Sequence, residues 1–459
     1  MLDQAILERA LKVISSAGDY ADIYLEERST LQIHLEDKRI ERISTGIDSG
    51  IGIRIVKDFK TFYAHTNDLS ESSIIGLAEA LKSLANKESL EKTLSIETQR
   101  PPIDFDILKR PDEVPLEQKS SILLKADEVA RRSPLIKQVK ITYSDTIKRV
   151  RIINSLGRSS EDERIYTTFV IHVIASSDGE LQTGYESIGG LAGFEILDQD
   201  APLRAAEIAR ERVLLMLKAR KAPGGRMPVV ISSEAGGTMI HEAIGHGLEA
   251  DLSQNGLSVF SNKKGEVVAS PLITVIDDAT MPFKRGSFRF DDEGTPAQKT
   301  VLVEKGILKT YMYDVITAMK DGVSSTGNGR RESYRHKPIP RMTNTIIAPG
   351  KDKPEDIIRS VERGLFVKKM GGGQVNTVTG DFVFEVQEGY LIEKGKISEP
   401  VRGATLTGNG PEVLKAIDMV GNDIGFSIGT CGKDSQGVPV SDGMPTIRIP
   451  EMIVGGVVQ

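Results

Sequence analysis

The residues best suited to chemistry are two histidines and a glutamate in the string HEAIGH, at residues 241–246, and the only cysteine of the chain, Cys431. Imidazole nitrogen and thiolate sulfur are good zinc ligands, and a catalytic zinc ion keeps three protein ligands and an open fourth position. His241, His246 and Cys431 therefore form a candidate zinc site. Glu242, next to the first histidine, is the candidate general base and is not counted as a ligand.

The spacing of the two histidines restricts the backbone between them. His241 and His246 stand one residue further apart than the histidines of the familiar H-E-x-x-H signature. In a regular α-helix such residues lie about 140° apart around the axis. Two arrangements would bring the rings together: a one-turn π-bulge, or a helix that ends near Gly245. Gly245 would loosen the backbone at this point.

The flanking sequence places the motif on a helix that follows a strand. Residues 228–232 (PVVIS) have the composition of a short buried strand. Ser232 or Ser233 can cap a helix that opens with Glu234. A buried helix with two hydrogen-bonded histidines and no metal is the plainer alternative.

Composition indicates an ordinary globular protein and excludes several classes. The chain has 459 residues, 39% hydrophobic and 27% charged, with a net charge of -6. Such an acidic balance argues against a nucleic-acid-binding protein. A single cysteine forbids an internal disulfide, the first residues lack a signal-peptide pattern, and no apolar run is long enough to span a bilayer. We therefore expect a cytoplasmic protein that binds no membrane.

The pattern along the chain predicts an α+β fold. We divide it into an N-terminal mixed helix and antiparallel-sheet part (1–90), a linker with four prolines (91–115), a central α/β part (116–220) and a β-rich C-terminal domain that carries the metal-binding helix (226–459). Antiparallel pairing is expected in the C-terminal domain. The first two parts suggest a duplicated unit of helix, strands and helix. The predicted helices span 3–17, 69–86, 117–132 and 201–219, the last with Asp200 as its cap and Pro202 in its first turn.

Several further segments have both a functional and a structural interpretation. Residues 371–373 (GGG) could admit a substrate backbone, although a flexible turn is favoured. Residues 327–331 (GNGRR) could bind a carboxylate or form a hairpin with solvated charges. Tyr334 and His336 could stabilise an oxyanion. Glu249 and Asp251 could orient a ligating histidine or lie at a solvated helix end.

The remaining histidines and one acidic run give weaker indications of a function. His34, His65 and His172 are expected to be surface or packed residues. The run DDE at 291–293 could bind a metal, but adjacent acids are usually solvated.

Four strings together resemble a known family. HEAIGHGLEAD (241–251), DDEGTP (291–296), PRMTN (340–344) and GTCGK (429–433) are similar to the TldD branch of the TldD/PmbA metalloproteases, and the resemblance extends over nearly the whole chain. It implies a cytoplasmic zinc peptidase with His241, His246 and Cys431 as ligands and Glu242 as catalytic carboxylate. It also implies a dimer with an enclosed cavity that admits peptides or unfolded segments. A homodimer is our first choice, and a heterodimer with a metal-free sister subunit is the second.

The predicted reaction is peptide hydrolysis. One thiolate and two neutral imidazoles would leave a zinc centre with a formal charge of about +1, which favours a reactive water near neutral pH. Glu242 would take a proton from that water and pass it to the departing amine. Two alternatives remain: a metal-dependent hydrolase of a non-peptide amide with a closed pocket, and a non-catalytic scaffold in which a structural zinc has a fourth protein ligand. No substrate-binding residue can be assigned from the sequence.

Overall fold

The first half of the chain folds as two units of the same element order. The computed structural model describes residues 2–85 and 94–457, so residues 86–93 of the predicted helix end and linker lie outside the described residues. In each unit a helix, three antiparallel strands and a second helix follow one another, as the suspected duplication predicts. The first unit contains α1 (Gln4–Ser15), β1 (Tyr20–Glu36), β2 (Arg39–Lys57), β3 (Lys60–Thr66) and α2 (Glu71–Ala85). The second contains α3 (Leu116–Ala130), β5 (Ile136–Asn154), β6 (Arg158–Ser177), β7 (Glu180–Leu191) and α4 (Ala201–Lys218).

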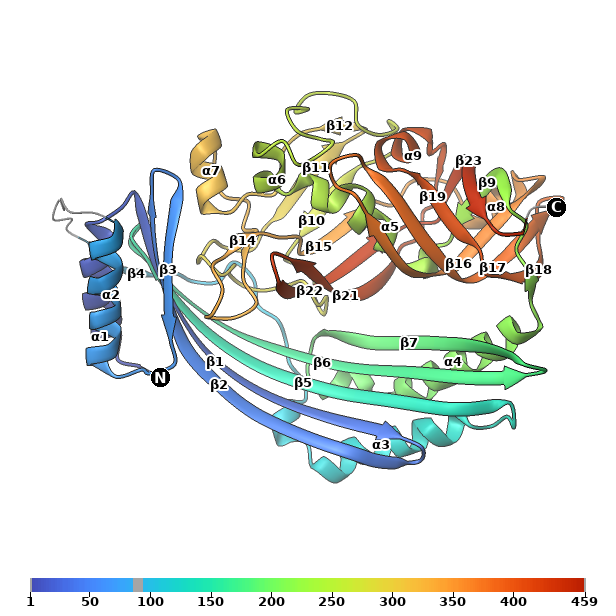
Figure 1. Cartoon of the computed structure of the whole chain (residues 1–459), viewed down its shortest axis with the longest axis horizontal. Helices are drawn as coiled ribbons and strands as arrows, with labels where there is room; N and C mark the ends of the chain where they lie inside the picture. The colour runs from blue at the N-terminus through green and yellow to red at the C-terminus, as the bar shows by residue number, and fades with distance from the viewer. Residues whose placement is uncertain (1, 86–93, 458–459) are drawn as a thin grey trace.

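Both units contribute to one long, curved sheet. Its strands run in the order β3-β2-β1-β5-β6, with β7 and the short β4 (Glu97–Thr98) also paired to β6. In Figure 1, α1 and α2 stand at one end of this sheet and α3 lies on the side away from the C-terminal domain. The C-terminal domain lies across the opposite side.

Apolar periodicity explains these elements. Helix α1 turns Leu7, Leu11 and Ile14 toward alternate isoleucines of β2, and all are buried in one cluster. Asp200 occupies the N-cap position of α4, as predicted, but its backbone is left-handed and its side chain makes no cap hydrogen bond. Pro202 does lie in the first turn, as expected.

The C-terminal domain contains a barrel and a second sheet. Five strands close the barrel in the order β16-β9-β23-β19-β17, with β17 paired back to β16. They are β9 (Gly225–Ile231), β16 (Arg363–Val375), β17 (Asp381–Glu393), β19 (Thr405–Asn409) and β23 (Ile447–Gly455). Beside them lie β8 (Arg220–Lys221), β18 (Lys396–Arg402) and β20 (Met419–Val420).

The second sheet has the order β12-β11-β10-β15-β22-β21, with β21 at its end. Its strands are β10 (Val275–Asp278), β11 (Lys299–Glu304), β12 (Ile307–Leu308), β15 (Asn344–Ile347), β21 (Gly425–Lys433) and β22 (Gln436–Met444). A separate pair joins β13 (Gly329–Arg330) to β14 (Ile339–Pro340). Short helices α6 (Ala250–Gln254), α7 (Val315–Asp321), α8 (Pro354–Arg359) and α9 (Gly410–Ala416) complete the domain.

The expected antiparallel pairing is found for most strand pairs of this domain, but there are parallel exceptions. β9 pairs in parallel with β16, and β15 pairs in parallel with β22. Parallel pairs need long connections. The chain supplies them by inserting the metal motif and most of the second sheet between β9 and β16. Within the described part of the chain, no helix has the length and apolar character needed to cross a membrane.

Candidate metal centre

The backbone of the HEAIGH motif forms a π turn. Strand β9 ends at Ile231, and the Ser232 side chain caps a short 3-10 turn at Ser233–Ala235. The predicted helix start at Glu234 is therefore wrong, because this turn ends at Gly236. Helix α5 (Thr238–Ile240) follows, and then the π turn His241–Gly245.

The π turn confirms the geometric prediction. The backbone N–H of His246 donates to the carbonyl of His241, five residues back, and the next turn (His246–Leu248) is already 3-10. Both proposed arrangements, the widened π turn and the end of the α-helix, are thus present. Gly245 has ordinary helical angles (φ -54°, ψ -58°), which any residue can adopt. The glycine is therefore not needed for the conformational freedom that the sequence suggested. A Cβ there would lie 2.2 Å from Sδ of Met342, so the buried Met342 side chain would have to shift to admit any larger residue.

The widened turn brings the three predicted ligands together. The His241 and His246 ring centroids are 4.9 Å apart, with ring planes at 87°. Cys431 reaches them from β21, with its Sγ 3.5 Å from Nε2 of His246. One candidate ligand atom from each of the three residues lies within 4.8 Å of the others. The described residues contain no other such group of three or more histidine, cysteine, aspartate or glutamate side chains.

Two carboxylates fix the orientation of the histidine rings. Nδ1 of His241 lies 2.8 Å from Oδ1 of Asp442, and Nδ1 of His246 lies 3.0 Å from Oε2 of Glu249. Each Nδ1 is thereby occupied, which leaves Nε2 as the metal-ligating atom, a common arrangement around zinc. The sequence interpretation included Glu249 but missed Asp442. Asp442 carries no motif of its own, and only the folding of β22 beside the helix brings it to His241.

A buried lysine, Lys433, forms ion pairs with the carboxylates next to the metal-binding turn. Lys433 Nζ lies 3.1 Å from Glu249 and 2.7 Å from Asp251. Asp251 therefore binds the lysine and not a histidine, and neither acid lies at a solvated helix end. Burial raises the pKa of Glu249, but the charge of Lys433 and the contact with His246 outweigh it and lower that pKa to about 2. Glu249 remains a carboxylate that can accept the imidazole N–H.

The charges of the cluster favour a bound cation. Burial raises the pKa of the Cys431 thiol, but hydrogen bonds and charge from His241 and His246 outweigh it and lower that pKa to about 6. Burial lowers the pKa of His246, yet Glu249 and Cys431 raise it to about 10. Asp442 and Cys431 raise the pKa of His241 in the same way. The Cys431 thiolate and the Glu249 carboxylate are thus stabilised by neighbouring positive charge, which the protons of the histidines supply and which a bound cation would supply in their place.

The donor set fits zinc. Two imidazole nitrogens and one thiolate, with a carboxylate behind each ring, are the ligands and supports that zinc prefers. Glu242 does not belong to the ligand group, but it lines an open cleft of about 500 Å³ together with His241, His246 and Cys431. We call this space the metal cleft. Thr430, Gly373 and Gln374 line it too, so the cleft lies between β21 and β16.

The glycine run Gly371–Gly373 is not a flexible turn. It belongs to β16, where the pairing with β17 shifts register three times between Val367 and Gly373. A Cβ at Gly373 would lie 1.9 Å from the Phe384 ring, so this position requires glycine. The run also borders two cavities, because Gly371 and Gly372 line a larger one of about 860 Å³.

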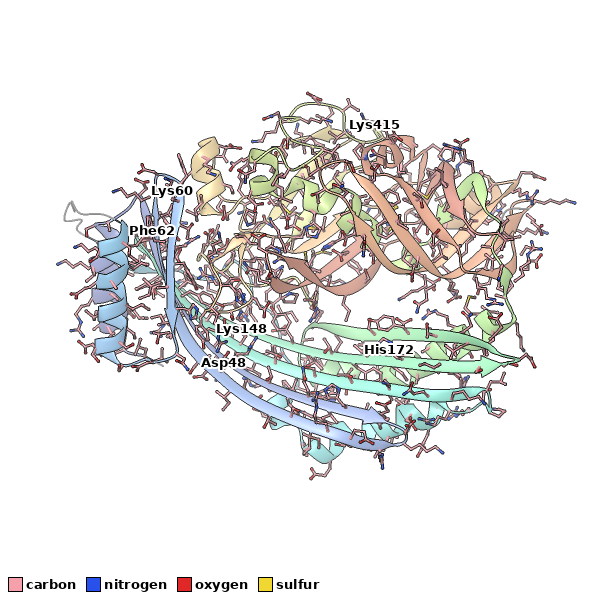
Figure 2. The ribbon with its side chains drawn as sticks, viewed as in Figure 1. Asp48, Lys60, Phe62, Lys148, His172 and Lys415 are labelled. Carbon is pink, nitrogen blue, oxygen red and sulfur yellow. The ribbon has the colours of Figure 1, made fainter. Side chains whose placement is uncertain are left out.

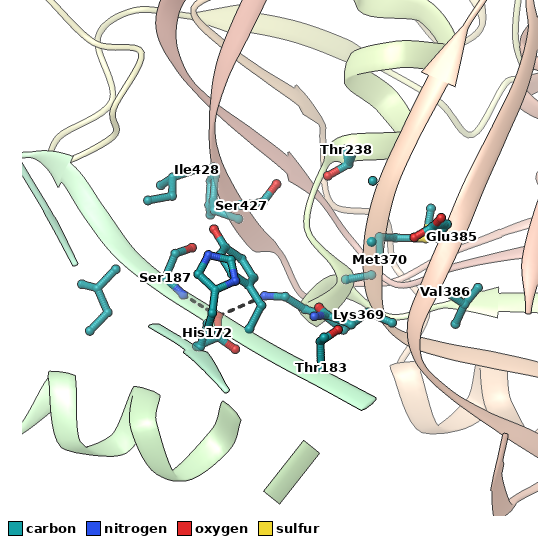
Figure 3. A pocket seen from close by; sticks show the side chains of 18 of the residues that line it. His172, Thr183, Ser187, Thr238, Lys369, Met370, Glu385, Val386, Ser427 and Ile428 are labelled. Atoms are coloured by element: carbon teal, nitrogen blue, oxygen red, sulfur yellow. Dashed lines mark hydrogen bonds and ion pairs between the residues drawn. The ribbon is translucent and has the colours of Figure 1, made fainter. Parts of the chain in front are cut away.

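The larger cavity separates the sheet from the barrel. Figure 3 shows His172, Thr183 and Ser187 on the side of the sheet and Lys369, Met370 and Glu385 on the side of the barrel. Lys369 pairs with Glu186 of β7 at 3.1 Å. His172, expected to be an ordinary surface or packed residue, therefore borders a cavity.

The acidic run Asp291–Glu293 joins the sheet to the C-terminal domain. The expectation of solvated acids is wrong, because the three side chains are at most 1% exposed. Glu293 pairs with Arg54 of β2 at 2.5 Å, and Asp292 pairs with Arg164 of β6 at 2.8 Å. Asp291 accepts backbone N–H bonds from Glu293, Thr295 and Gly329. The run is therefore a buried ionic contact between the two halves of the chain.

The other candidates lie away from the metal cleft. Arg330 and Arg331 are 2% exposed, so the solvated hairpin is wrong. Tyr334 donates to Asp48 of β2 at 3.1 Å, and Nδ1 of His336 contacts the Ser333 hydroxyl at 3.1 Å. Neither Tyr334 nor His336 lines the metal cleft, which removes the basis for an oxyanion role. Figure 2 shows Asp48 on the sheet.

Comparisons with known proteins agree along the whole chain. Models of the PmbA/TldA metallopeptidase match domain 1 at residues 21–87, the central domain at 109–217 and the C-terminal domain at 224–456. A protein of Haemophilus influenzae named "Metalloprotease TldD homolog" is 40% identical over 95% of this chain and 93% of its own length. The "Zinc metalloprotease TldD homolog" of Saccharolobus solfataricus is 29% identical over 96% and 97% of the two chains.

Solved structures share the fold. The chain superimposes on TldE from Thermococcus kodakarensis with a TM-score of 0.79, at 19% identity, over 98% of this chain and 100% of that one. A crystal structure from Thermotoga maritima gives a TM-score of 0.81 at 22% identity, over 98% and 100%. With three family domains in order and a close match to relatives named TldD, the chain belongs to the PmbA/TldD family of metallopeptidases.

Proposed function

We propose that this chain is a zinc-dependent peptidase that hydrolyses peptides or unfolded protein segments. One observation carries the proposal: His241, His246 and Cys431 present three ligand atoms to one point, and Glu242 lines the cleft that opens beside it. Three protein ligands and a neighbouring carboxylate are the pattern of a catalytic zinc site. The names of the relatives support the same class of enzyme.

The residues of the chain have distinct tasks in this reaction. Zinc, when bound, would supply Lewis acidity that activates water and polarises the scissile carbonyl. The Glu242 carboxylate would accept the proton of the attacking water and deliver it to the departing amine. Asp442 and Glu249 would hold the imidazole rings with Nε2 toward the metal. Cys431 would bind as a thiolate, since the pKa of its thiol is about 6.

The shape of the site favours an extended chain as substrate. The metal cleft and the larger cavity follow successive residues of the same two strands, β16 and β21. β21 is the last strand of its sheet order, and a peptide can bind to such a strand through main-chain hydrogen bonds. A non-peptide amide would need a pocket closed around a small molecule, and the metal cleft is open. A structural zinc would need a fourth protein ligand, and the ligand group contains three residues.

We further propose that the protein works in the cytoplasm as a dimer. A lone thiolate ligand is best preserved in a reducing compartment. A homodimer would enclose the cleft and is the commonest form of soluble oligomer. A heterodimer with a metal-free sister subunit remains the alternative.

The test compares one substrate in two states. The zinc-loaded protein is incubated with a folded globular protein and with the same protein permanently unfolded, and light scattering gives the mass of the active species. We expect a dimer of two identical chains that cleaves only the unfolded form. An active monomer that cleaves both forms equally would contradict the enclosed dimer, and a loaded protein that cleaves neither would contradict the peptidase.

A further inference from the structure

A second, strongly cationic cavity lies next to the metal cleft. Its volume is about 320 Å³, and Thr430, the residue before Cys431, lines both spaces. Successive side chains of a strand point to opposite faces, so Thr430 and Cys431 project to opposite sides of β21. We call this space the arginine cavity. Its lining includes six cations, namely Arg28, Lys148, Arg164, Arg285, Arg330 and Arg331.

Four of these cations are already paired with carboxylates. Figure 2 labels Lys148 on the sheet, and its Nζ also donates to the carbonyl of Glu332 at 3.0 Å. The pairs, with their distances, are Arg28–Asp48 at 3.6 Å, Lys148–Glu26 at 3.1 Å, Arg164–Asp292 at 2.8 Å and Arg331–Asp22 at 3.3 Å.

Arg285 and Arg330 differ from the other four. Among the described residues, neither guanidinium has a carboxylate within 4.0 Å, and the Nε of each has no hydrogen-bond partner. Arg330 is 2% exposed and donates to the carbonyl of Pro439 at 2.7 Å. Arg285 donates to the carbonyl of Gly429 and to the Thr430 hydroxyl. Neutral oxygens therefore hold the Arg285 guanidinium against β21 and the Arg330 guanidinium against β22, where a carbonyl of Met342 also accepts from Arg330.

The energetics of burial make this arrangement unusual. A buried charge is costly unless an opposite charge compensates it. Burial accordingly lowers the pKa of both guanidinium groups, that of Arg330 to about 10. Two acids line the cavity, Asp292 and Glu332. Asp292 is bound to Arg164, and the Glu332 carboxylate accepts the backbone N–H of Gly437 at 2.6 Å. An excess of positive charge remains.

We propose that the arginine cavity binds a carboxylate of the peptide whose scissile bond lies in the metal cleft. Guanidinium groups bind carboxylates through paired, charge-assisted hydrogen bonds. The carboxylate would come from the chain terminus of the peptide or from an aspartate or glutamate side chain near the scissile bond. The shared residue Thr430 links the two spaces, because a peptide extended along β21 presents neighbouring side chains to its two faces. This proposal rests on the proposed peptidase function.

The test measures binding without turnover. Full-length, zinc-loaded Glu242→Gln protein is titrated with fluorescent unfolded peptides by anisotropy. The peptide set contains an acidic parent, versions in which each Glu is replaced by Gln, and a version with an amidated C-terminus. We expect one of these losses of charge to raise the Kd by about tenfold or more, since charge-assisted hydrogen bonds are strong. Sensitivity to amidation identifies the chain terminus as the source, and sensitivity to one Glu identifies the side chain.

Variants of the two arginines complete the test. In Arg285→Gln and in Arg330→Gln, we expect the acidic and neutral peptides to bind alike, while Arg285→Lys restores part of the difference. Arg226→Gln is the matched control, because Arg226 is an exposed residue paired with Glu451. Retained zinc shows that a variant has folded, and Arg285, which is only half-buried, provides the test if Arg330→Gln does not fold. Equal binding of all peptides, or a difference that survives the arginine variants, would overturn the proposal.

Hydrolysis is followed separately with the unaltered protein. Absence of hydrolysis with a persistent carboxylate preference in binding would contradict the peptidase alone. Hydrolysis with no carboxylate preference would contradict the arginine cavity alone.

Discussion

Nδ1 of His241 lies 2.8 Å from Oδ1 of Asp442, a residue 201 positions further along the chain. This contact joins the π turn that carries His241 to β22, and it leaves Nε2 of the ring to face the metal cleft. Its counterpart on the other histidine is local, because Glu249 lies three residues from His246. One ring is therefore oriented by its own turn and the other by the second sheet.

Replacing Asp442 by Asn should weaken zinc binding. The amide keeps the size of the side chain but loses the charge that supports the ring, and loss of such a support typically costs 10- to 100-fold in metal affinity. Competition with a chromogenic chelator measures the change. Asp434→Asn is the control, since Asp434 is exposed in a turn with φ of 50°, which asparagine tolerates. Equal zinc affinities in the two variants would contradict the role of Asp442.

Replacing Cys431 by Ala should remove most of the bound zinc. Two imidazoles alone form a poor zinc site, and the chain has no other cysteine. Metal analysis after dialysis gives the zinc content per chain, and circular dichroism verifies the fold. A Cys431→Ala protein that binds zinc as tightly as the unaltered protein would refute the three-ligand site.

Replacing Glu242 by Gln should preserve zinc and abolish turnover. Removing a general base typically costs about 10²-fold or more in rate. The rate of peptide hydrolysis and the zinc content are measured on the same preparation. Glu266→Gln, at an exposed position, should be fully active. If Glu242→Gln were as active as this control, the assigned role would be wrong.

Zinc binding should release protons from the histidines and weaken as the pH falls. The pKa of His246 is raised to about 10, so its ring carries an extra proton at pH 8 when the metal is absent, and the pKa of His241 is raised as well by Asp442 and Cys431. The pKa of Cys431 is lowered to about 6, so the thiol is already ionised at that pH. Zinc requires neutral imidazoles and a thiolate.

Calorimetry in buffers of different ionisation enthalpy counts the protons. We expect at least one at pH 8, from His246, and below pH 6 a steeper loss of affinity as the thiolate is protonated as well. Release of no proton at pH 8, or no further loss of affinity below pH 6, would contradict this assignment.

Replacing Gly245 by Ala should destabilise the protein. The new methyl group would lie 2.2 Å from Sδ of Met342, which is fully buried, and such overpacking costs about 1–3 kcal/mol. Urea unfolding measures the free energy of unfolding. The matched control is Gly76→Ala in α2, where a Cβ meets nothing within 4 Å and alanine favours the helix. Equal stability of the two variants would show that Met342 moves aside freely.

The parts of the structure that sequence could predict depend on short-range patterns. The helices of the first half follow from apolar spacing, and the π turn follows from the number of residues between His241 and His246. The missed features depend on contacts between distant segments. The burial of Asp291–Glu293 requires arginines that β2 and β6 bring to them. Likewise, no local pattern distinguishes Asp442 from any other aspartate in a strand, and the parallel pairing of β9 with β16 is visible only after folding.

The curved sheet is symmetric about its middle. β1 and β5 are the first strands of the two units, and they pair with each other antiparallel from Asp22 opposite Asn154 to Glu36 opposite Lys140. Two equivalent strands paired in this way have the symmetry of a two-fold dimer interface within a single chain. A fragment that contains the first unit alone would therefore expose the whole edge of β1. Such an edge would pair with a second copy of itself or aggregate, so each unit protects the other from self-association.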